Sequence, residues 1–155
     1  MSSAPSGLHP TAARLQGRLR ERELDVVVQM LPASTRTVPE AAAAVGCEVG
    51  QIVKSLVFMR GDEPVMVLCA GDRRVAADRL GLRPATADEA RAGTGFAIGG
   101  IPPLGHDRPL ETLIDASLRR FDTLWCAAGT PHAVFRCSAS ELAQFSGGKF
   151  VDVKE

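Results

Sequence analysis

The stretch Ile52–Met59, "IVKSLVFM", constrains the fold more than any other part of the chain. It is apolar at almost every position, and a short run of this kind is typical of a strand that is covered on both faces. Lys54 stands within it, and a lysine ammonium inside a covered strand costs free energy unless it reaches water or an anion. The sequence therefore predicts a buried strand and raises the question of what Lys54 binds.

The chain has 155 residues, the length of one domain, and a domain of this size can bury enough surface to fold without metals or disulfides. Residues 1–10, "MSSAPSGLHP", are small and polar without periodicity. We therefore expect a flexible tail over residues 1–10 and a single domain over residues 11–155. The formal net charge of +0 argues against a non-specific nucleic-acid binder with a large basic field, although it leaves room for a local basic patch.

The four cysteines include no Cys-x-x-Cys pair, and no apolar run approaches the length of about 18 residues that a membrane span needs. These features predict a reduced, cytoplasmic protein without a membrane anchor. No histidine pairs with a cysteine at metal-ligand spacing, so we expect neither a metal site nor a cofactor.

Four helices are expected. Apolar residues recur every three to four positions from 11 to 31, which predicts an amphipathic helix that stops at Pro32. Its arginines indicate either a solvated face or a basic surface for an RNA backbone: Arg14, Arg18, Arg20 and Arg22. Three more helices should begin at capping boxes, in which a Ser or Thr is followed by Glu three residues later, and end near a glycine: Thr37 to Gly46, Thr86 to Gly93, and Ser138 to Gly147.

Strand-like runs outnumber the helices. They lie at residues 54–60 and 65–70, on either side of the turn "GDEP", and at residues 96–98, 111–114, 123–127, 133–136 and 150–153. The order of elements is neither a regular βαβ alternation nor a repeat. We therefore predict an α+β domain with a mixed, strongly curved, barrel-like sheet surrounded by helices.

Residues 96–105, "FAIGGIPPLG", combine permissive glycines with rigid prolines. A loop of this kind can aim the amides of Gly99, Gly100 and Ile101 at a carbonyl or phosphate oxygen. Its alternative is an ordinary turn. It is not a phosphate-binding P-loop, because the Gly-Lys-Ser/Thr ending is missing.

Residues 37–153 resemble the YbaK/EbsC family of aminoacyl-tRNA editing domains, which also occur inserted in bacterial prolyl-tRNA synthetases. Five segments carry the resemblance in order: "EAAAAVGCEVGQIVKSLVF", "PVMVLCAGDRRV", "TGFAIGGIPPLG", "LIDASLRRFDTLWCAAG" and "KFVDV". The resemblance implies the fold of the prolyl-tRNA synthetase-associated domain.

The resemblance also implies an activity: metal-independent, cofactor-free hydrolysis of the ester between a wrong amino acid and a tRNA 3′ end. Relatives that clear alanine, cysteine or serine share the motifs, with tRNA-Pro as one carrier. The chain would act in trans as a free-standing protein on the tRNA 3′ end. A cognate synthetase as partner and the choice between a monomer and a weak homodimer stay open. The rival from another class is a module that binds the acceptor end of tRNA, or a nucleotide, without hydrolysis.

Lys54 matches the family lysine at the mouth of the pocket, where it would hold the phosphate-bearing end or orient the ester. Gly99 and Pro103 match the Gly-x-x-x-Pro loop, whose backbone would grip the ester carbonyl and the terminal ribose together with the amides of Gly100 and Ile101. Water or the ribose 2′-OH would then attack the carbonyl, and no side-chain nucleophile is required.

The resemblance implies substrate contacts for Ser55, Asp115, Gly129 and His132 as well. Asp115 has an equal structural alternative, which is to cap the turn before "ASLRR". The spacing around His132, in "AAGTPHAVF", differs from that of the synthetase-embedded domain. A rival enzyme mechanism would use Cys69 or Cys126 as a nucleophile activated by His132, but both cysteines lie in apolar strand segments, where thiols are usually inert.

Overall fold

Strand β2 (Ile52–Arg60) is the central strand of the domain and contains the apolar run with Lys54. It forms an antiparallel hairpin with β3 (Glu63–Ala70), in which Arg60 pairs with Glu63 across a two-residue turn. The first turn residue, Gly61, has φ +62°, the left-handed conformation that tight hairpin turns favour. The hairpin predicted around "GDEP" is confirmed.

The computed structural model describes residues 8–24 and 26–153, so most of the predicted tail lies outside the described residues. The remaining strands are β1 (Gln29–Met30), β4 (Arg83–Pro84), β5 (Glu111–Asp115), β6 (Leu124–Ala127), β7 (Ala133–Cys137) and β8 (Lys149–Val151). The α-helices are α1 (Pro10–Glu21), α2 (Val38–Val45), α3 (Ala87–Thr94) and α4 (Ala139–Ser146). Short 3₁₀ helices are η1 (Val49–Gln51), η2 (Asp78–Leu80) and η3 (Ala116–Arg120).

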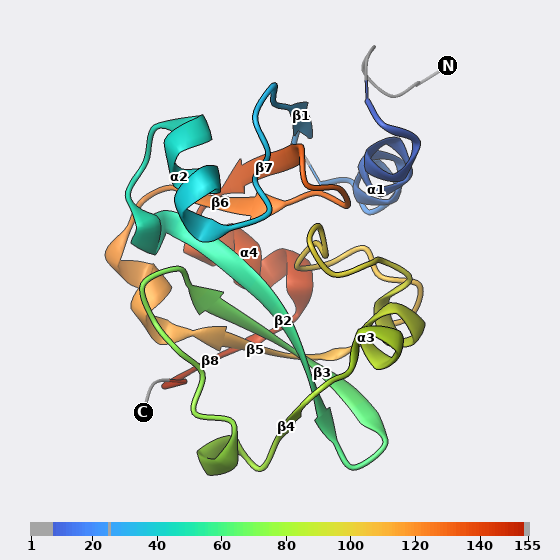
Figure 1. Ribbon diagram of the computed structural model, residues 1–155, viewed down its shortest axis with the longest axis vertical. Helices are drawn as coiled ribbons and strands as arrows, with labels where there is room; N and C mark the ends of the chain where they lie inside the picture. Colours follow the sequence, from blue (N-terminus) through green and yellow to red (C-terminus); the bar gives the residue numbers. More distant parts are fainter. Residues whose placement is uncertain (1–7, 25, 154–155) are drawn as a thin grey trace.

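The strands form one mixed sheet in the order β1-β7-β6-β2-β3-β5-β8, with β4 attached to β2 off this path (Figure 1). β2 runs parallel to β6, and β5 runs parallel to both β3 and β8; the other pairs are antiparallel. The predicted α+β class and mixed sheet are confirmed. The sheet is not closed into a barrel, because β1 and β8 remain its outer strands and no pairing within the described residues joins them.

The hairpin is apolar at nearly every position because both faces of the sheet are covered. Met66, Leu68 and Ala70 belong to the main core cluster, which also contains buried residues of α1 and α4. The alternate residues of β3 pack into a second cluster on the opposite face, with Leu82 and Val153: Val65, Val67 and Cys69. A continuous apolar run is the expected signature of such a strand.

The first helix is shorter than predicted. α1 ends at Glu21, and Glu23 follows with φ +59°. Val26 and Val28 are buried while Val27 between them is 57% exposed, which is the alternation of an extended chain. The side chain of Gln16 holds this segment, because its Nε2 donates to the Val26 carbonyl at 3.0 Å and its Oε1 accepts from the Val28 amide at 2.7 Å. Three consecutive β-branched valines favour the extended form over a helix.

The predicted capping residues of the other three helices are confirmed. Thr37, Thr86 and Ser138 each accept a hydrogen bond from the amide three residues later, and they begin α2, α3 and α4. The left-handed residues Gly46 and Gly147 follow the last residues of α2 and α4 as predicted, and α3 ends at Thr94, one residue past the predicted Gly93, with left-handed Gly95 as its C-cap. The strand predicted at residues 96–98 is wrong, since these residues form a loop.

Gly17→Ala should stabilise the protein, because Gly17 is an exposed position of α1 where a Cβ would meet no atom within 4 Å. Alanine restricts the unfolded chain more than glycine does, so we expect a gain of about 0.5–1 kcal/mol in the free energy of unfolding. Chemical denaturation of the two proteins measures it. A loss of stability would contradict the packing described for α1.

Candidate functional site

Strand β2 changes partner along one edge, and the change leaves a gap in the sheet. Residues 52–53 pair with β6 and residues 58–59 pair with β4. Between these two pairings, residues 54–57 have no strand partner on this edge within the described part of the chain. The gap therefore places four residues of a central strand, Lys54 among them, beside an opening in the sheet.

Main-chain groups of Ser55 point into this gap. The carbonyl of Ile52 accepts from the Gly71 amide on the β3 side, at 2.8 Å, whereas the carbonyl of Val57 accepts from the Ala85 amide on the opposite side, at 3.2 Å. Because main-chain groups alternate between the two edges of a strand, the N–H and C=O of Ser55 share the edge of Val57. A donor and an acceptor of one residue thus face the opening.

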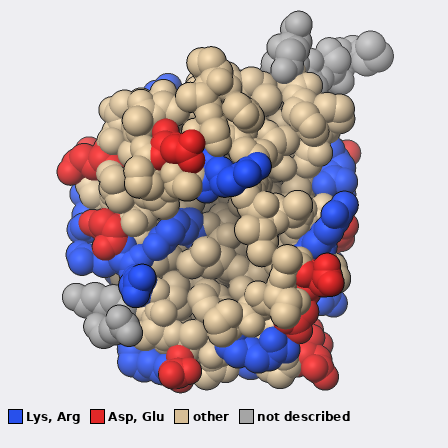
Figure 2. Space-filling model, viewed as in Figure 1, with Lys and Arg blue, Asp and Glu red and all other residues tan. Residues whose placement is uncertain are grey.

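A cavity of about 800 Å³ opens over the gap, and Figure 2 shows a hollow in this face of the molecule with largely uncharged walls. Its walls come from β2, from α2 and the residues before it, from the glycine-proline loop, and from β6 with its neighbours: Thr35–Val38, Ala41, Val45, Ile52–Phe58, Pro84, Ala85, Ala90, Ile98–Ile101, Trp125–Ala127 and Val134. The charged residues among these are Arg36 and Lys54, both cationic, and no carboxylate of the described chain lines the cavity. The cavity is suited to an apolar or neutral group that carries an anion.

The ammonium of Lys54 binds a main-chain carbonyl. Its Nζ donates to the carbonyl oxygen of Arg73 at 2.5 Å, and the residue is half-buried. Its cross-strand partner is Cys69, whose pKa burial raises to about 12, although the nearby positive charge of Lys54 acts in the opposite direction. A neutral carbonyl does not cancel the charge of Lys54, so the ammonium keeps its attraction for an anion.

The glycine-proline loop forms another wall of the cavity through Gly99, Gly100 and Ile101. The Gly100 carbonyl accepts from the Gly129 amide at 2.7 Å, so Gly129 supports the loop. A Cβ at Gly100 would lie 2.7 Å from main-chain atoms of Thr130. Pro103 lines a separate, smaller cavity of about 260 Å³ rather than this one.

Two arginines of α1 hold the loop from behind. Arg14 donates to the Gly95 carbonyl at 3.0 Å and its guanidinium lies 4.7 Å from the centre of the buried Phe96 ring. Arg18 donates to the Gly105 carbonyl at 2.7 Å and forms an ion pair with Asp107 at 2.9 Å. These arginines brace the loop, a role that neither the solvated-face nor the RNA-surface interpretation of the helix anticipated.

The other residues assigned to the substrate divide between the cavity and its surroundings. Ser55 lines the cavity, and its buried Oγ has no hydrogen-bond partner in the described structure. Asp115 does not line it: its carboxylate accepts from the amides of Ala70 and Ser117 and caps η3, as its structural alternative predicted. His132 is exposed outside the cavity, with Nδ1 3.3 Å from the Leu31 carbonyl. The substrate-contact roles stay predictions.

Sequence reasoning missed Arg36 and Trp125, which line the cavity. Arg36 precedes the capping residue of α2, but nothing in the local pattern says that this loop faces the glycine loop, where a Cβ on Gly99 would lie 3.6 Å from Arg36 Nε. Trp125 looks like an ordinary strand residue, and its pairing with Ile52 brings it to the cavity. Both placements depend on contacts between segments far apart in sequence.

The candidate thiol nucleophiles are poorly suited to the role. Cys126 lines the cavity but is 1% exposed, and burial raises its pKa well above the ordinary thiol value. Cys69 is also buried, and a thiol with a raised pKa holds almost no thiolate at neutral pH. Within the described residues, no group of three or more His, Cys, Asp or Glu side chains is arranged to hold a metal ion. No described helix has the length and apolarity of a membrane span.

Residues 32–145 match the family model of the aminoacyl-tRNA editing domain. The chain is 33% identical over 140 residues to the uncharacterised protein YwhH of Bacillus subtilis (strain 168), across 85% of this chain and 88% of that protein. It is 29% identical over 110 residues to a proline–tRNA ligase of Streptococcus equi subsp. equi (strain 4047), across 66% of this chain and 18% of the ligase. A crystal structure described as a candidate trans-editing enzyme for prolyl-tRNA synthetase superposes with a TM-score of 0.90 at 47% identity, covering 96% of this chain and 99% of that one.

Proposed function

The chain belongs to the family of aminoacyl-tRNA editing domains, and on this premise we propose that it hydrolyses the ester between a wrong amino acid and the 3′ end of a tRNA. We propose further that it acts in trans, on tRNA released by a synthetase. This proposal is supported by the similarity over nearly the whole length of both chains to the candidate trans-editing enzyme.

The observation that carries the proposal is the meeting of Lys54 and the glycine-proline loop at one cavity. Lys54 comes from β2 and the loop lies more than forty residues later, yet both line the same space of about 800 Å³. Arg36 adds a second positive charge to the wall. The terminal adenosine of a tRNA carries a phosphate and an ester within a short distance of each other, and such a ligand needs a cation beside neutral donors.

In the proposed reaction the amides of the loop polarise the ester carbonyl, and Lys54 holds the phosphate or orients the ester. Water adds to the carbonyl carbon, either directly or with the ribose 2′-OH accepting its proton. The bond between the carbonyl carbon and the ribose oxygen then breaks, and the ribose hydroxyl leaves with a proton. The products are the free amino acid and an uncharged tRNA.

The composition of the cavity wall supports water or substrate as the source of the nucleophile. Among the described residues, no His, Asp or Glu side chain lines the cavity, so a side-chain general base is not at hand. Positioning and electrostatic stabilisation must then supply most of the rate. The main-chain N–H and C=O of Ser55 are further groups that can bind the polar atoms of the aminoacyl ester.

We propose small amino acids as the substrate class, with alanine, cysteine and serine on tRNA-Pro and other tRNAs as the first candidates. The experiment is a deacylation assay with purified protein and a panel of tRNAs charged with each of these amino acids, with correctly charged Pro-tRNA-Pro as the control. Hydrolysis of at least one mischarged tRNA well above the spontaneous rate supports the proposal. Tight binding of the acceptor end without hydrolysis of any of them overturns it in favour of a binding module.

Replacing either candidate thiol nucleophile, Cys69 or Cys126, should leave the chemistry intact. We expect the Cys69→Ser and Cys126→Ser proteins to keep kcat per folded molecule within about a factor of three, because their raised pKa values make thiolate attack unfavourable. The folded fraction of each variant is measured by circular dichroism beside the rate. Loss of turnover in a folded variant would favour a thiol mechanism.

A further inference from the structure

The turn that follows β3 carries the acceptor for Lys54. Residues 71–73 leave the strand, and the carbonyl of Arg73 receives the lysine ammonium at 2.5 Å. None of the ion pairs between described residues involves Lys54, so this carbonyl is the group that fixes the ammonium. The position of the lysine charge therefore depends on the position of the turn.

The turn has little freedom next to the strands. The Gly71 amide donates to the Ile52 carbonyl at 2.8 Å, and the Arg73 amide donates to the Ala70 carbonyl at 3.0 Å. A Cβ on Gly71 would collide with the carbonyl oxygen of Val49, so the main chain passes too close to η1 for any larger residue.

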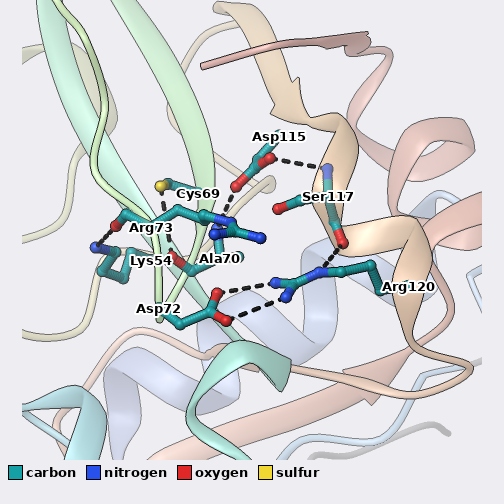
Figure 3. A network of polar contacts seen from close by, with 8 residues as sticks. All are labelled: Lys54, Cys69, Ala70, Asp72, Arg73, Asp115, Ser117 and Arg120. Carbon is teal, nitrogen blue, oxygen red and sulfur yellow. Dashed lines mark hydrogen bonds and ion pairs between the residues drawn. The ribbon is translucent and has the colours of Figure 1, made fainter. Parts of the chain in front are cut away.

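A second set of contacts fixes the turn from the side of η3 (Figure 3). Asp72 receives two hydrogen bonds from the guanidinium of Arg120, at 2.8 and 3.1 Å, in a forked ion pair. Arg120 is itself held, since its Nε donates to the Ser117 carbonyl at 2.7 Å and its guanidinium lies 4.8 Å from the centre of the Phe121 ring. The Asp115 carboxylate joins the two elements, because it accepts from the amides of Ala70 and Ser117.

We infer that Asp72 and Arg120 are positioning residues for Lys54: their forked ion pair sets the turn whose Arg73 carbonyl holds the lysine ammonium at the cavity. This inference rests on the proposed function for its catalytic consequence, but its geometric content does not. Both partners are about one-third exposed, and an ion pair with such exposure contributes little to stability on its own. Its forked geometry and fixed guanidinium suit it to orientation.

The variants that test the inference are Asp72→Asn, which removes the charge and keeps the size of the side chain, and Arg120→Gln, which removes the guanidinium and shortens the side chain. The matched control is Glu111→Gln, which breaks the more exposed ion pair between Glu111 and Arg60 at the far end of β2. A charge exchange, Asp72→Arg with Arg120→Asp, provides the rescue. Thermal melting establishes that each protein is folded.

The readout is nuclear magnetic resonance of protein labelled with ¹³C at the lysine Cε. The chain has three lysines, Lys54, Lys149 and Lys154, so the spectrum is simple, and the signal missing from a Lys54→Arg protein identifies Lys54. We expect Asp72→Asn and Arg120→Gln to move and broaden the Lys54 signal, the exchange protein to restore it in part, and Glu111→Gln to leave it unchanged.

The deacylation rate of the same variants is the second measurement. With the best substrate of the tRNA panel, kcat should fall about tenfold in Asp72→Asn and Arg120→Gln with little change in KM, and recover partly in the exchange protein. A Lys54 signal that stays unchanged in both folded variants overturns the inference, whatever the rates are. If the signal moves but the wild-type protein hydrolyses none of the tRNAs, the positioning is supported and the proposed function is the part that fails.

Discussion

Lys54→Ala should lower kcat/KM for the best mischarged tRNA by about a hundredfold or more, the usual cost of losing one well-placed electrostatic contact to a reacting group. The cavity contains two positive charges, and Lys54 is the one fixed by the main chain of a neighbouring turn. The side chain is half-buried and contributes no ion pair within the described structure, so its removal should leave the protein folded.

Lys54→Arg should be almost as inactive as Lys54→Ala. A guanidinium keeps the charge but is planar and longer, and it cannot place a single point charge at the Arg73 carbonyl as an ammonium does. Lys149→Ala, at an exposed position of β8, is the control and should keep full activity. Rates are measured under single-turnover conditions, and near-wild-type turnover of a folded Lys54→Ala protein would remove this residue from the mechanism.

Gly100→Ala should destabilise the protein by about 1–3 kcal/mol, the usual cost of forcing an extra methyl group into a packed site. The added Cβ would lie 2.7 Å from the Cα and the amide nitrogen of Thr130 and 2.8 Å from the carbonyl carbon of Gly129. These are main-chain atoms, so no side chain can rotate away to relieve the contact. The same change would disturb the hydrogen bond from the Gly129 amide to the Gly100 carbonyl.

If Gly100 faced only the substrate, a Cβ there would lower kcat without affecting stability, whereas its contact with the main chain of Thr130 predicts a loss of stability. Differential scanning calorimetry of Gly100→Ala beside Gly17→Ala separates the two, because the same substitution at Gly17 meets open space. An unchanged melting temperature for Gly100→Ala would contradict the close approach of the glycine-proline loop to the main chain of Gly129 and Thr130. The kcat of each variant is measured per folded molecule.

The features that depend on a few neighbouring residues could be predicted from the sequence. The capping residues Thr37, Thr86 and Ser138 each bind an amide three residues away, and the turn between β2 and β3 has Gly61 in the left-handed conformation. Each of these features can therefore be recognised in a short stretch of sequence. The predicted first helix was too long, because the helical spacing of apolar residues continues beyond the end of α1. The chain at Val26–Val28 is instead extended and hydrogen-bonded to the side chain of Gln16.

The candidate site was predicted where one segment carries the signal and missed where two segments must meet. Lys54 stands out as a charge in an apolar run, and the glycine-proline loop stands out by composition. Arg36, and the brace that Arg14 and Arg18 form on the loop, depend on contacts with residues at least sixty positions away in the sequence. No periodicity or spacing encodes such contacts.

The gap beside β2 has a consequence for solubility. An unpaired stretch of strand edge is a template on which another chain can add a strand, and proteins normally protect such edges with charges, bulges or covering elements. Here residues 54–57 lie at a cavity whose other walls include α2 and the loop over residues 98–101, so an extended segment of a second molecule would have to displace these elements to pair with β2. The walls that would enclose a small ligand therefore also prevent strand pairing with a second molecule. A variant that loosens the loop over residues 98–101 should form strand-mediated aggregates sooner than a variant altered in the turn between β2 and β3.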